Sequence, residues 1–381
     1  MTASRIGIDA TVILPGRKGL GFFLERLIRS MDPKLFQAPP VVYIDKCFAK
    51  EARERWPSLN LRSVSCRPSS LWEIYGLPWH IKKEGVRILF TGRDRTVLEP
   101  LCRTVVYLFE VPYFRQQALM SSGATWYDRL AMRISRERFT QVVRHATKFI
   151  VSSTFTCREL GSRYGVMPDR ITVVYPGVDP LFCPAPDEET RLAARDKFTC
   201  GRRYALHFAT GDIRDNTDVA LRIFKHSLDS MGGDLHLLIA GVPQPERHRW
   251  SRVIDQNRLT DRVSVAGYLA NDDLLSVYQG ADAYLDPTRY EGFGFQNLEA
   301  MACGVPVLSS SAASVPEVVG EAGLLYQPDD IQGFSQGLQR VFCDRDFAAT
   351  LKKKGLEQAK RFGLERSVRE IQLVLKNLDE G

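Results

Sequence analysis

Residues 281–326 read ADAYLDPTRYEGFGFQNLEAMACGVPVLSSSAASVPEVVGEAGLLY, and this stretch decides the fold. Short apolar runs alternate with segments that contain Gly and Pro, a pattern typical of βα units. It predicts strand, loop, helix, strand, loop and short helix, in that order. We expect the first helix at residues 295–303, because glycine favours the position just past a helix end and Gly304 stands there. The run SVPE at 314–317 matches a capping box, which predicts that the second helix begins one residue later.

The loop before the first of these helices has the sequence EGFGF, residues 291–295. Amides at a helix start lack partners within the helix, and the helix dipole favours an anion such as a phosphate there. Gly292 and Gly294 carry no Cβ, so a ligand can approach the backbone closely. Glu299 follows Glu291 after seven intervening residues, and each carboxylate can accept hydrogen bonds from hydroxyls. The loop and helix therefore predict a site for a sugar attached to a nucleoside diphosphate.

The same stretch resembles the donor-site signature of the retaining GT-B glycosyltransferases of family 4, in which two glutamates are separated by seven residues. The match covers PTRYEGFGFQNLEAMACGVPVLSS at 287–310 and SAASVPEVVG at 311–320. The resemblance implies an α/β protein of GT-B architecture, with two Rossmann-like parallel-sheet domains facing a central cleft. The alternative from the residues alone is an ordinary α/β turn whose two glutamates bind nothing.

Composition bounds the class of protein. A chain of 381 residues is long enough for two domains. Its eight cysteines are scattered, without a Cys-x-x-Cys pair or metal-ligand spacing, which predicts reduced thiols in the cytoplasm and no metal site. The opening MTASRIGIDATVIL lacks the order of a signal peptide, and no apolar run approaches the ~18 residues of a membrane span. We expect a cytoplasmic protein that, if it works at a membrane, lies peripherally on the inner face.

The charge is uneven along the chain. Residues 1–185 carry 28 basic and 16 acidic side chains, whereas residues 186–381 carry 24 and 29. The positive excess favours an anionic partner for the first half. No nucleic-acid-binding motif is present, so an anionic membrane surface or a lipid-diphosphate acceptor fits better than a nucleic acid. The alternative is a basic surface that serves solubility only.

A helix predicted at residues 126–146 concentrates part of this charge. Four arginines fall on one face, within about 80° of arc at 100° per residue: Arg129, Arg133, Arg136 and Arg144. Such a stripe can bind phosphoryl headgroups or an acceptor diphosphate, and a solvated helix face is the alternative. Residues 72–83, WEIYGLPWHIKK, place aromatic side chains beside two lysines, which fits either a membrane interface or a packed helix.

Alternating strand and helix patterns occur in two series, which begin near residues 5–10 and 204–209. Such series predict parallel sheets whose ligands bind beyond the carboxyl ends of the strands. We expect a first, acceptor-side domain at 1–185 and a second, donor domain at 186–364. Residues 365–381 carry an apolar stripe at helical spacing. The resemblance implies that this helix packs back on the first domain, and the alternative is a helix of the second domain.

The first strand-to-helix turn has the sequence GRKGLG, residues 16–21. A glycine-rich turn offers backbone amides to an anion, and Arg17 and Lys18 strengthen that offer. In the resembled family this loop lies near the donor diphosphate and the acceptor. Gly19 and Gly21 are therefore candidate binding residues.

Two positions depart from the pattern of the family. Where an Arg and a Lys usually hold the donor diphosphate, this chain has TGDIRDN at 210–216, so Asp215 stands at the Lys position beside Arg214. A carboxylate close to a diphosphate is repelled, by ~1 kcal/mol at 4 Å in bulk water. Where the family often has His-Asp, this chain has Phe109 and Glu110. Glu110 can keep the acidic role, but Phe109 cannot donate a hydrogen bond.

The resemblance implies transfer of a hexose, with a lean toward mannose, from a GDP- or UDP-sugar to a saccharide or lipid-linked saccharide. Retention at the anomeric carbon, no metal and no cofactor are implied, in the synthesis of a surface polysaccharide such as lipopolysaccharide or of a glycolipid. Catalytic roles are implied for Glu291, Arg214 and Glu110. The implied donor-binding residues are Gly292, Phe293, Gly294, Phe295, Glu299, Gly19, Gly21, Gly211 and Tyr268. The alternative is a catalytically weakened GT-B protein that binds a nucleotide sugar or scaffolds a glycan-assembly complex, as the missing Lys would explain.

Overall fold

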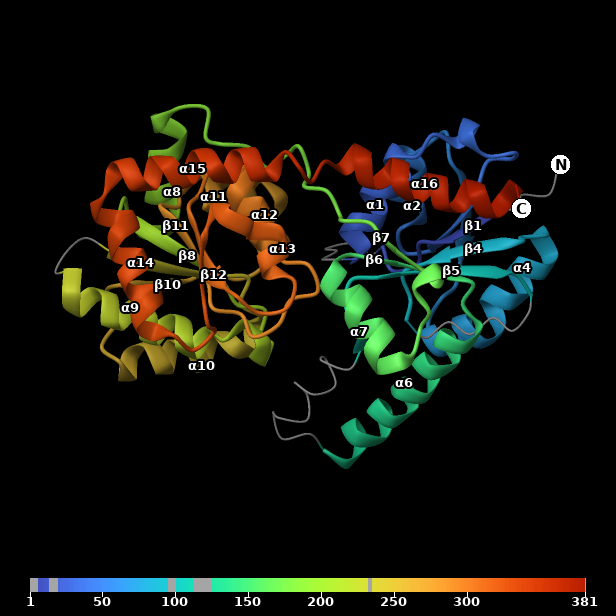
Figure 1. Ribbon diagram of the computed structural model, residues 1–381, viewed down its shortest axis with the longest axis horizontal. Helices are drawn as coiled ribbons and strands as arrows, with labels where there is room; N and C mark the ends of the chain where they lie inside the picture. Colours follow the sequence, from blue (N-terminus) through green and yellow to red (C-terminus); the bar gives the residue numbers. More distant parts are fainter. Residues whose placement is uncertain (1–5, 14–19, 95–100, 113–124, 232–234, 381) are drawn as a thin grey trace. The chain divides into compact units, whose positions relative to one another are not determined.

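A computed structural model describes residues 6–13, 20–94, 101–112, 125–231 and 235–380 of the chain (Figure 1). The chain divides into two compact units, 1–177 with 364–381, and 178–363. The divisions expected from the sequence are 185/186 and 364/365. The earlier first boundary has a physical reason: the Val178 amide donates to the Phe362 carbonyl oxygen at 2.9 Å, and Val178 forms a bridge with Gly363. The segment that begins at Val178 is therefore tied to the second unit.

The first unit contains a seven-stranded sheet in the order β3-β2-β1-β4-β5-β6-β7, and its adjacent strands pair in parallel. The strands are β1 Ile6–Asp9, β2 Val41–Asp45, β3 Asn60–Val64, β4 Ile88–Thr91, β5 Arg103–Leu108, β6 Lys148–Val151 and β7 Ile171–Val173. Its helical segments are α1 Leu20–Ser30, η1 Pro33–Leu35, α2 Ala49–Arg55, α3 Ser69–Leu71, η2 Trp72–Gly76, α4 Leu77–Glu84, α6 Trp126–His145, α7 Thr154–Tyr164, η3 Pro168–Arg170 and α16 Leu364–Glu380. Strands such as β4 are buried along their whole length, as expected when helices cover both faces.

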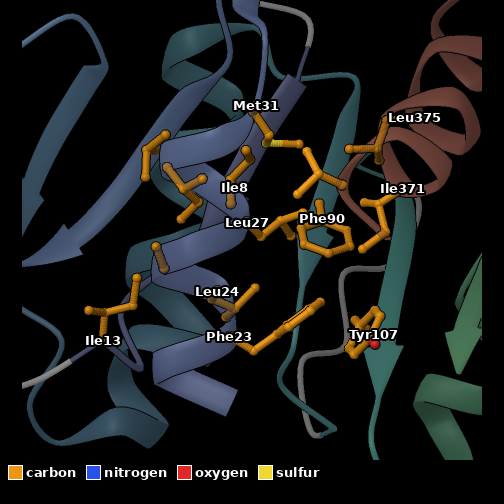
Figure 2. Packing of buried hydrophobic residues seen from close by; sticks show 14 of the residues in the cluster. Ile8, Ile13, Phe23, Leu24, Leu27, Met31, Phe90, Tyr107, Ile371 and Leu375 are labelled. Carbon is orange, nitrogen blue, oxygen red and sulfur yellow. The ribbon is translucent and has the colours of Figure 1, made fainter. Parts of the chain in front are cut away.

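Helix α16 completes the core of the first unit, although it is the last element of the chain. Ile371 and Leu375 are fully buried and join a cluster formed by α1, β1, β4 and β5. Figure 2 shows both side chains directed toward Phe90 of β4. At its edge, the Gln372 side-chain amide donates to the Asp32 carbonyl oxygen at 3.0 Å. Apolar burial therefore assigns α16 to the first unit.

The second unit contains a six-stranded sheet in the order β10-β9-β8-β11-β12-β13, again with parallel pairs. The strands are β8 Arg203–Phe208, β9 Leu235–Ala240, β10 Val263–Val265, β11 Ala283–Asp286, β12 Val307–Ser310 and β13 Leu324–Tyr326. The helical segments are α8 Glu188–Thr199, η4 Ile213–Asp215, α9 Thr217–Met231, α10 Gln244–Gln256, α11 Asn271–Gly280, α12 Phe295–Ala302, α13 Val315–Val319, η5 Gly320–Ala322, α14 Ile331–Cys343 and α15 Arg345–Ala359. Helices lie on both sides of this sheet (Figure 1). The predicted α/β class with two Rossmann-like parallel sheets is confirmed.

The order of strands in the second unit decides which loops meet. Strand β11 lies between β8 and β12, and parallel strands end at the same edge of a sheet. The loops after β8, β11 and β12 therefore emerge side by side. They contain residues 209–216, 287–294 and 311–314, which include these candidates: Gly211, Arg214, Glu291, Gly292, Phe293 and Gly294.

The packing of α16 can be tested with a matched pair of leucines on that helix. Leu375→Ala should lower the free energy of unfolding by about 2–5 kcal/mol, because Leu375 is buried in the core and its truncation leaves a cavity. Leu373→Ala should change it by less than about 0.5 kcal/mol, since Leu373 is half exposed. Urea denaturation followed by circular dichroism measures both. Equal effects of the two substitutions would contradict this packing.

Candidate active site

The loop that joins β11 to α12 forms the centre of the site. Gly294 precedes the helix with φ 91°, a left-handed conformation that strains residues with a Cβ. As the N-cap it offers no side chain to the first-turn amides of α12. A backbone of this kind suits an anion at the helix start. Phe293 is buried and packs on Phe295 and Phe362, with ring centroids 5.1 and 5.9 Å away, so its ring anchors the loop instead of facing a ligand.

The backbone of Glu291 is held by a residue that follows the neighbouring strand β12. The Ser314 hydroxyl donates to the Glu291 carbonyl oxygen at 2.7 Å. Helix α13 begins at Val315 as predicted, but the capping box is wrong: the Ser314 side chain does not cap α13. Its hydroxyl is used on the loop instead. Ser314 therefore joins the loop after β12 to the loop after β11.

Glu299 lies in α12, half-buried, where the Tyr278 hydroxyl donates to its Oε2 at 2.8 Å. Tyr278 comes from α11 and is fully buried. Burial, with the Glu299 charge beside it, raises the pKa of Tyr278 well above its ordinary value, so the hydroxyl keeps its proton. Tyr278 thus fixes the orientation of the carboxylate. Sequence reasoning missed this residue because nothing in the pattern of α11 marks its contact with α12.

Arg214 lies against the same loop. Its carbonyl oxygen accepts from the Arg289 amide at 2.9 Å and from the Thr288 hydroxyl at 3.0 Å. Its guanidinium lies 5.7 Å from the centroid of the Tyr290 ring. Nη2 donates to Oδ2 of Asp212 at 2.7 Å. The structure therefore brings Arg214 to the loop that carries Glu291, as an ion pair with Asp212.

Asp215, which stands at the position of the usual Lys, faces the preceding turn. Its Oδ2 accepts from the Thr210 amide at 2.5 Å and from the Thr210 hydroxyl at 2.8 Å. Burial is the main cause that raises the pKa of Asp215, to about 6, and the charges of Asp212 and Asp286 add to it. Asp215 is therefore negative above pH 6 and neutral below it. Together with Asp212 it outweighs the positive charge of Arg214 at neutral pH.

Asp286 is a buried carboxyl group next to the site, and it was not selected from the sequence. Asp286 ends β11 and accepts from the Asn297 side-chain amide at 2.7 Å and from the Ser309 hydroxyl at 3.3 Å. These bonds tie α12 and β12 to β11. Burial raises the pKa of Asp286 to about 6. A polar residue at the carboxyl end of a parallel strand, just before the motif, was the available signal.

The remaining candidates of the second unit lie on two other loops. Gly211 has φ 88° in the turn after β8, where a side chain would be strained. Tyr268 is half exposed and follows β10, and two strands separate β10 from β11. The strand order therefore does not bring Tyr268 to the α12 amino end.

The candidates of the first unit lie at the carboxyl edge of its own sheet. Glu110 follows β5 and is half-buried. Phe109 packs edge-on against Phe23 and Tyr107, with centroids 5.4 and 5.1 Å away, so this ring serves packing. Gly21 is buried in the first turn of α1. Gly19, with Arg17 and Lys18, lies outside the described residues.

Two further properties concern the described part of the chain. It contains no cluster of three His, Cys, Asp or Glu side chains that could hold a metal ion. None of its helices combines the length and the apolar character needed to span a membrane.

Comparison with protein families gives two matches that together run through most of the chain. The model described as Glycosyltransferase Family 4 matches residues 5–181, and the model described as Glycosyl transferases group 1 matches residues 194–358. The chain belongs to the GT-B glycosyltransferases of family 4. The family resemblance found in the sequence is confirmed.

Among curated proteins, the chain is similar to the O-antigen chain mannosyltransferase B of Escherichia coli. The two are 28% identical over 220 residues, which cover 58% of each chain. It is also similar to the D-inositol 3-phosphate glycosyltransferase of Mycolicibacterium smegmatis, at 31% identity over 239 residues, 60% of this chain and 52% of the relative. The matched part thus spans little more than half the length of these two relatives.

Solved structures share the fold over nearly the whole chain. Sucrose-phosphate synthase from Thermosynechococcus elongatus superposes with a TM-score of 0.79 at 19% identity and covers 98% of both chains. The Anabaena HepE protein, in complex with UDP and glucose, superposes with a TM-score of 0.73 at 17% identity and covers 98% of this chain and 99% of its own. These likenesses establish the GT-B fold.

The raised pKa of Asp286 predicts a pH-dependent stability. In the folded protein this carboxyl keeps its proton up to about pH 6, whereas its ordinary value is 3.8. Its contribution to stability is therefore present below pH 3.8 and is lost as the pH rises to about 6. Relative to Asp286→Asn, the wild type should lose stability between pH 4.5 and 6.5 and change little above pH 7. Urea denaturation of both proteins at several pH values measures the difference, and a constant difference would contradict the assignment.

Proposed function

We propose that this protein is a retaining glycosyltransferase that moves a hexose from a nucleotide diphosphate sugar to a saccharide or lipid-linked saccharide. The observation that carries the proposal is the amino end of α12, with Glu291 in the loop before it, Glu299 in the helix and Arg214 against the same loop. We place the reaction in surface polysaccharide or glycolipid synthesis. The lean toward mannose is supported by the name of the matched Escherichia coli relative. The proposed donor is a UDP-sugar or a GDP-sugar.

The donor diphosphate would lie over the first-turn amides of α12. The helix dipole and those amides favour the negative charge that grows on the diphosphate as the glycosidic bond breaks. Arg214 supplies a cation on the same loop. The reaction that we propose uses no metal and no cofactor, and it relies on these amides and on Arg214 to stabilise the charge of the leaving group.

The two glutamates would hold the two sugar rings of the donor. Glu291 would accept from hydroxyls of the transferred hexose. Glu299 would accept from the ribose hydroxyls, and the bond from Tyr278 keeps its carboxylate oriented for this. Neither acts as a nucleophile in this proposal. The nucleotide would leave and the acceptor oxygen attack on the same face of the hexose, which gives retention.

The acceptor side is assigned to the first unit. Glu110, at the end of β5, is the proposed acidic residue there, and the basic character of residues 1–185 supports an anionic, lipid-linked acceptor. We propose no nucleic-acid partner. The protein would work in the cytoplasm, peripherally on the inner face of a membrane.

A panel of donors tests the reaction. Wild-type protein and Glu291→Gln are incubated with UDP- and GDP-sugars and crude lipid acceptors, and released nucleotide is measured. We expect Glu291→Gln to lower kcat/KM by about 10- to 100-fold, since a hydrogen bond to a charged group is worth about 1.5–3 kcal/mol. Glu357→Gln, an exposed change on α15 of the same unit, is the control and should be silent.

Three experimental outcomes would contradict parts of this proposal. Nucleotide binding without turnover on any donor identifies the non-catalytic GT-B alternative. Loss of activity in EDTA with recovery in Mn²⁺ contradicts metal independence. An inverted anomeric configuration of the product, read by NMR coupling, contradicts retention.

The charge of Asp215 predicts how nucleotide affinity depends on pH. At pH 8 Asp215 is ionised and repels the diphosphate, so Asp215→Asn should bind UDP or GDP about fivefold more tightly, from ~1 kcal/mol of removed repulsion. At pH 5.5 the wild-type carboxyl is mostly protonated, and the two proteins should bind alike. Isothermal titration calorimetry measures both, with Asp218→Asn as the exposed control. The same ratio at both pH values would refute this role.

A further inference from the structure

The first half of α6 carries an apolar stripe on the side opposite the face that packs on its own unit. Toward the carboxyl end of α6, its buried side chains mark the face that packs on the first unit: Ser135, Phe139, Val142 and Val143. Residues 126–134 contribute no buried side chain among those described. At 100° per residue, Trp126, Leu130 and Ile134 fall within about 80° of arc, on the side opposite the buried face. Their exposed fractions are 76%, 48% and 53%.

Arginines border this stripe along one side. Arg129, Arg133 and Arg136 are all exposed and fall within about 60° of arc, next to the apolar arc. Glu137 lies in line with the apolar residues and ends the stripe after Ile134. Asp128 lies on another side of the helix, and its carboxylate accepts a hydrogen bond from the Thr125 amide. The outward face of this half-helix is therefore apolar in the middle and basic along one edge.

Helix α6 is tied to its unit by ion pairs that involve two buried carboxylates, Glu73 and Asp9. Arg138 pairs with Glu73 of η2 at 2.8 Å, and the other oxygen of Glu73 pairs with Arg93 at 3.2 Å. Arg93 also pairs with Asp9 at the end of β1 at 3.2 Å. This chain of ion pairs ties α6 to the centre of its sheet. Figure 1 shows the helix extending from its unit at the end that carries Trp126.

The segment that holds Glu73 is itself apolar on its surface. Exposed large side chains occur on α3, η2 and α4: Leu71, Ile74, Tyr75 and Trp79. Lys83 lies over the Trp79 ring at 4.5 Å. Exposed apolar side chains that form a contiguous patch can mark a surface that binds a protein or a membrane. Aromatic rings with adjacent cations are typical of the boundary between lipid headgroups and acyl chains.

We propose that the outward face of α6 between Trp126 and Arg136 docks this protein on a membrane that contains anionic phospholipid. Trp126, Leu130 and Ile134 enter the headgroup boundary, and the bordering arginines contact lipid phosphates. The arginines along one edge favour an anionic membrane over an apolar protein partner as the occupant of this face. This goes beyond the proposed reaction, because it names the surface at which the protein would meet a lipid-linked acceptor.

Vesicle binding by the full chain, without donor, tests the proposal. Phosphatidylcholine vesicles with 30% phosphatidylglycerol should co-sediment the protein at least about fivefold more than vesicles of phosphatidylcholine alone. The variant Leu130→Ser/Ile134→Ser should lose most of the binding to both, and Arg129→Glu/Arg133→Glu should lose the preference for anionic lipid. Leu192→Ser and Arg345→Glu, exposed changes in the second unit, are the matched controls and should bind like the wild type.

A second measurement follows the helix itself. Vesicles should blue-shift the tryptophan fluorescence of the wild type, and Trp126→Phe should lose most of that shift, even if the double variants fold poorly. The proposal is overturned if neither double variant changes sedimentation or if Trp126→Phe shifts like the wild type. Concentration-dependent self-association abolished by Leu130→Ser/Ile134→Ser, without vesicle binding, would instead assign the face to a second copy of the chain. Each of these results leaves the donor panel unaffected, because no step of this assay uses nucleotide.

Discussion

Parallel pairing of β8, β11 and β12 is the constraint on which the candidate site depends. Their common direction puts the loops after all three strands at one edge, so residues 209–216, 287–294 and 311–314 meet although about a hundred residues separate the first from the last. The hydrogen bonds of Arg214 and Ser314 to the middle loop follow from that adjacency. Asp286 then holds α12 and β12 to β11. Without this register the two glutamates would have no fixed relation to Arg214.

The charges at the site do not all favour an anion. A helix start and one arginine favour a diphosphate, but Asp212 holds that arginine and Asp215 adds a second negative charge. Bonds from Thr210 and a raised pKa reduce the cost of that second charge without removing it. If the donor binds as we propose, its affinity would therefore depend on pH.

Two helices of the first unit use their apolar stripes differently. Helix α16 buries its apolar stripe against α1 and β4, which makes the end of the chain part of the first core. The first half of α6 leaves its apolar stripe exposed, while ion pairs to the buried carboxylates of Glu73 and Asp9 tie the helix to its sheet. Both stripes have helical spacing. Their different exposure distinguishes the face of α16 that packs in the core from the face of α6 that we propose docks on a membrane.

The sequence alone determined the α/β class, the two parallel sheets, the family, the extent of α12 within one residue and the arginine stripe of α6, because these follow from local periodicity and turn chemistry. Tertiary structure alone decided that Ser314 binds the Glu291 carbonyl instead of capping α13, and that Tyr278 orients Glu299. It also separated Tyr268 from the donor loop and turned Phe293 into the core. Local patterns specify which element a residue belongs to. Contacts between elements depend on strand order and burial, which arise only when distant segments pack together.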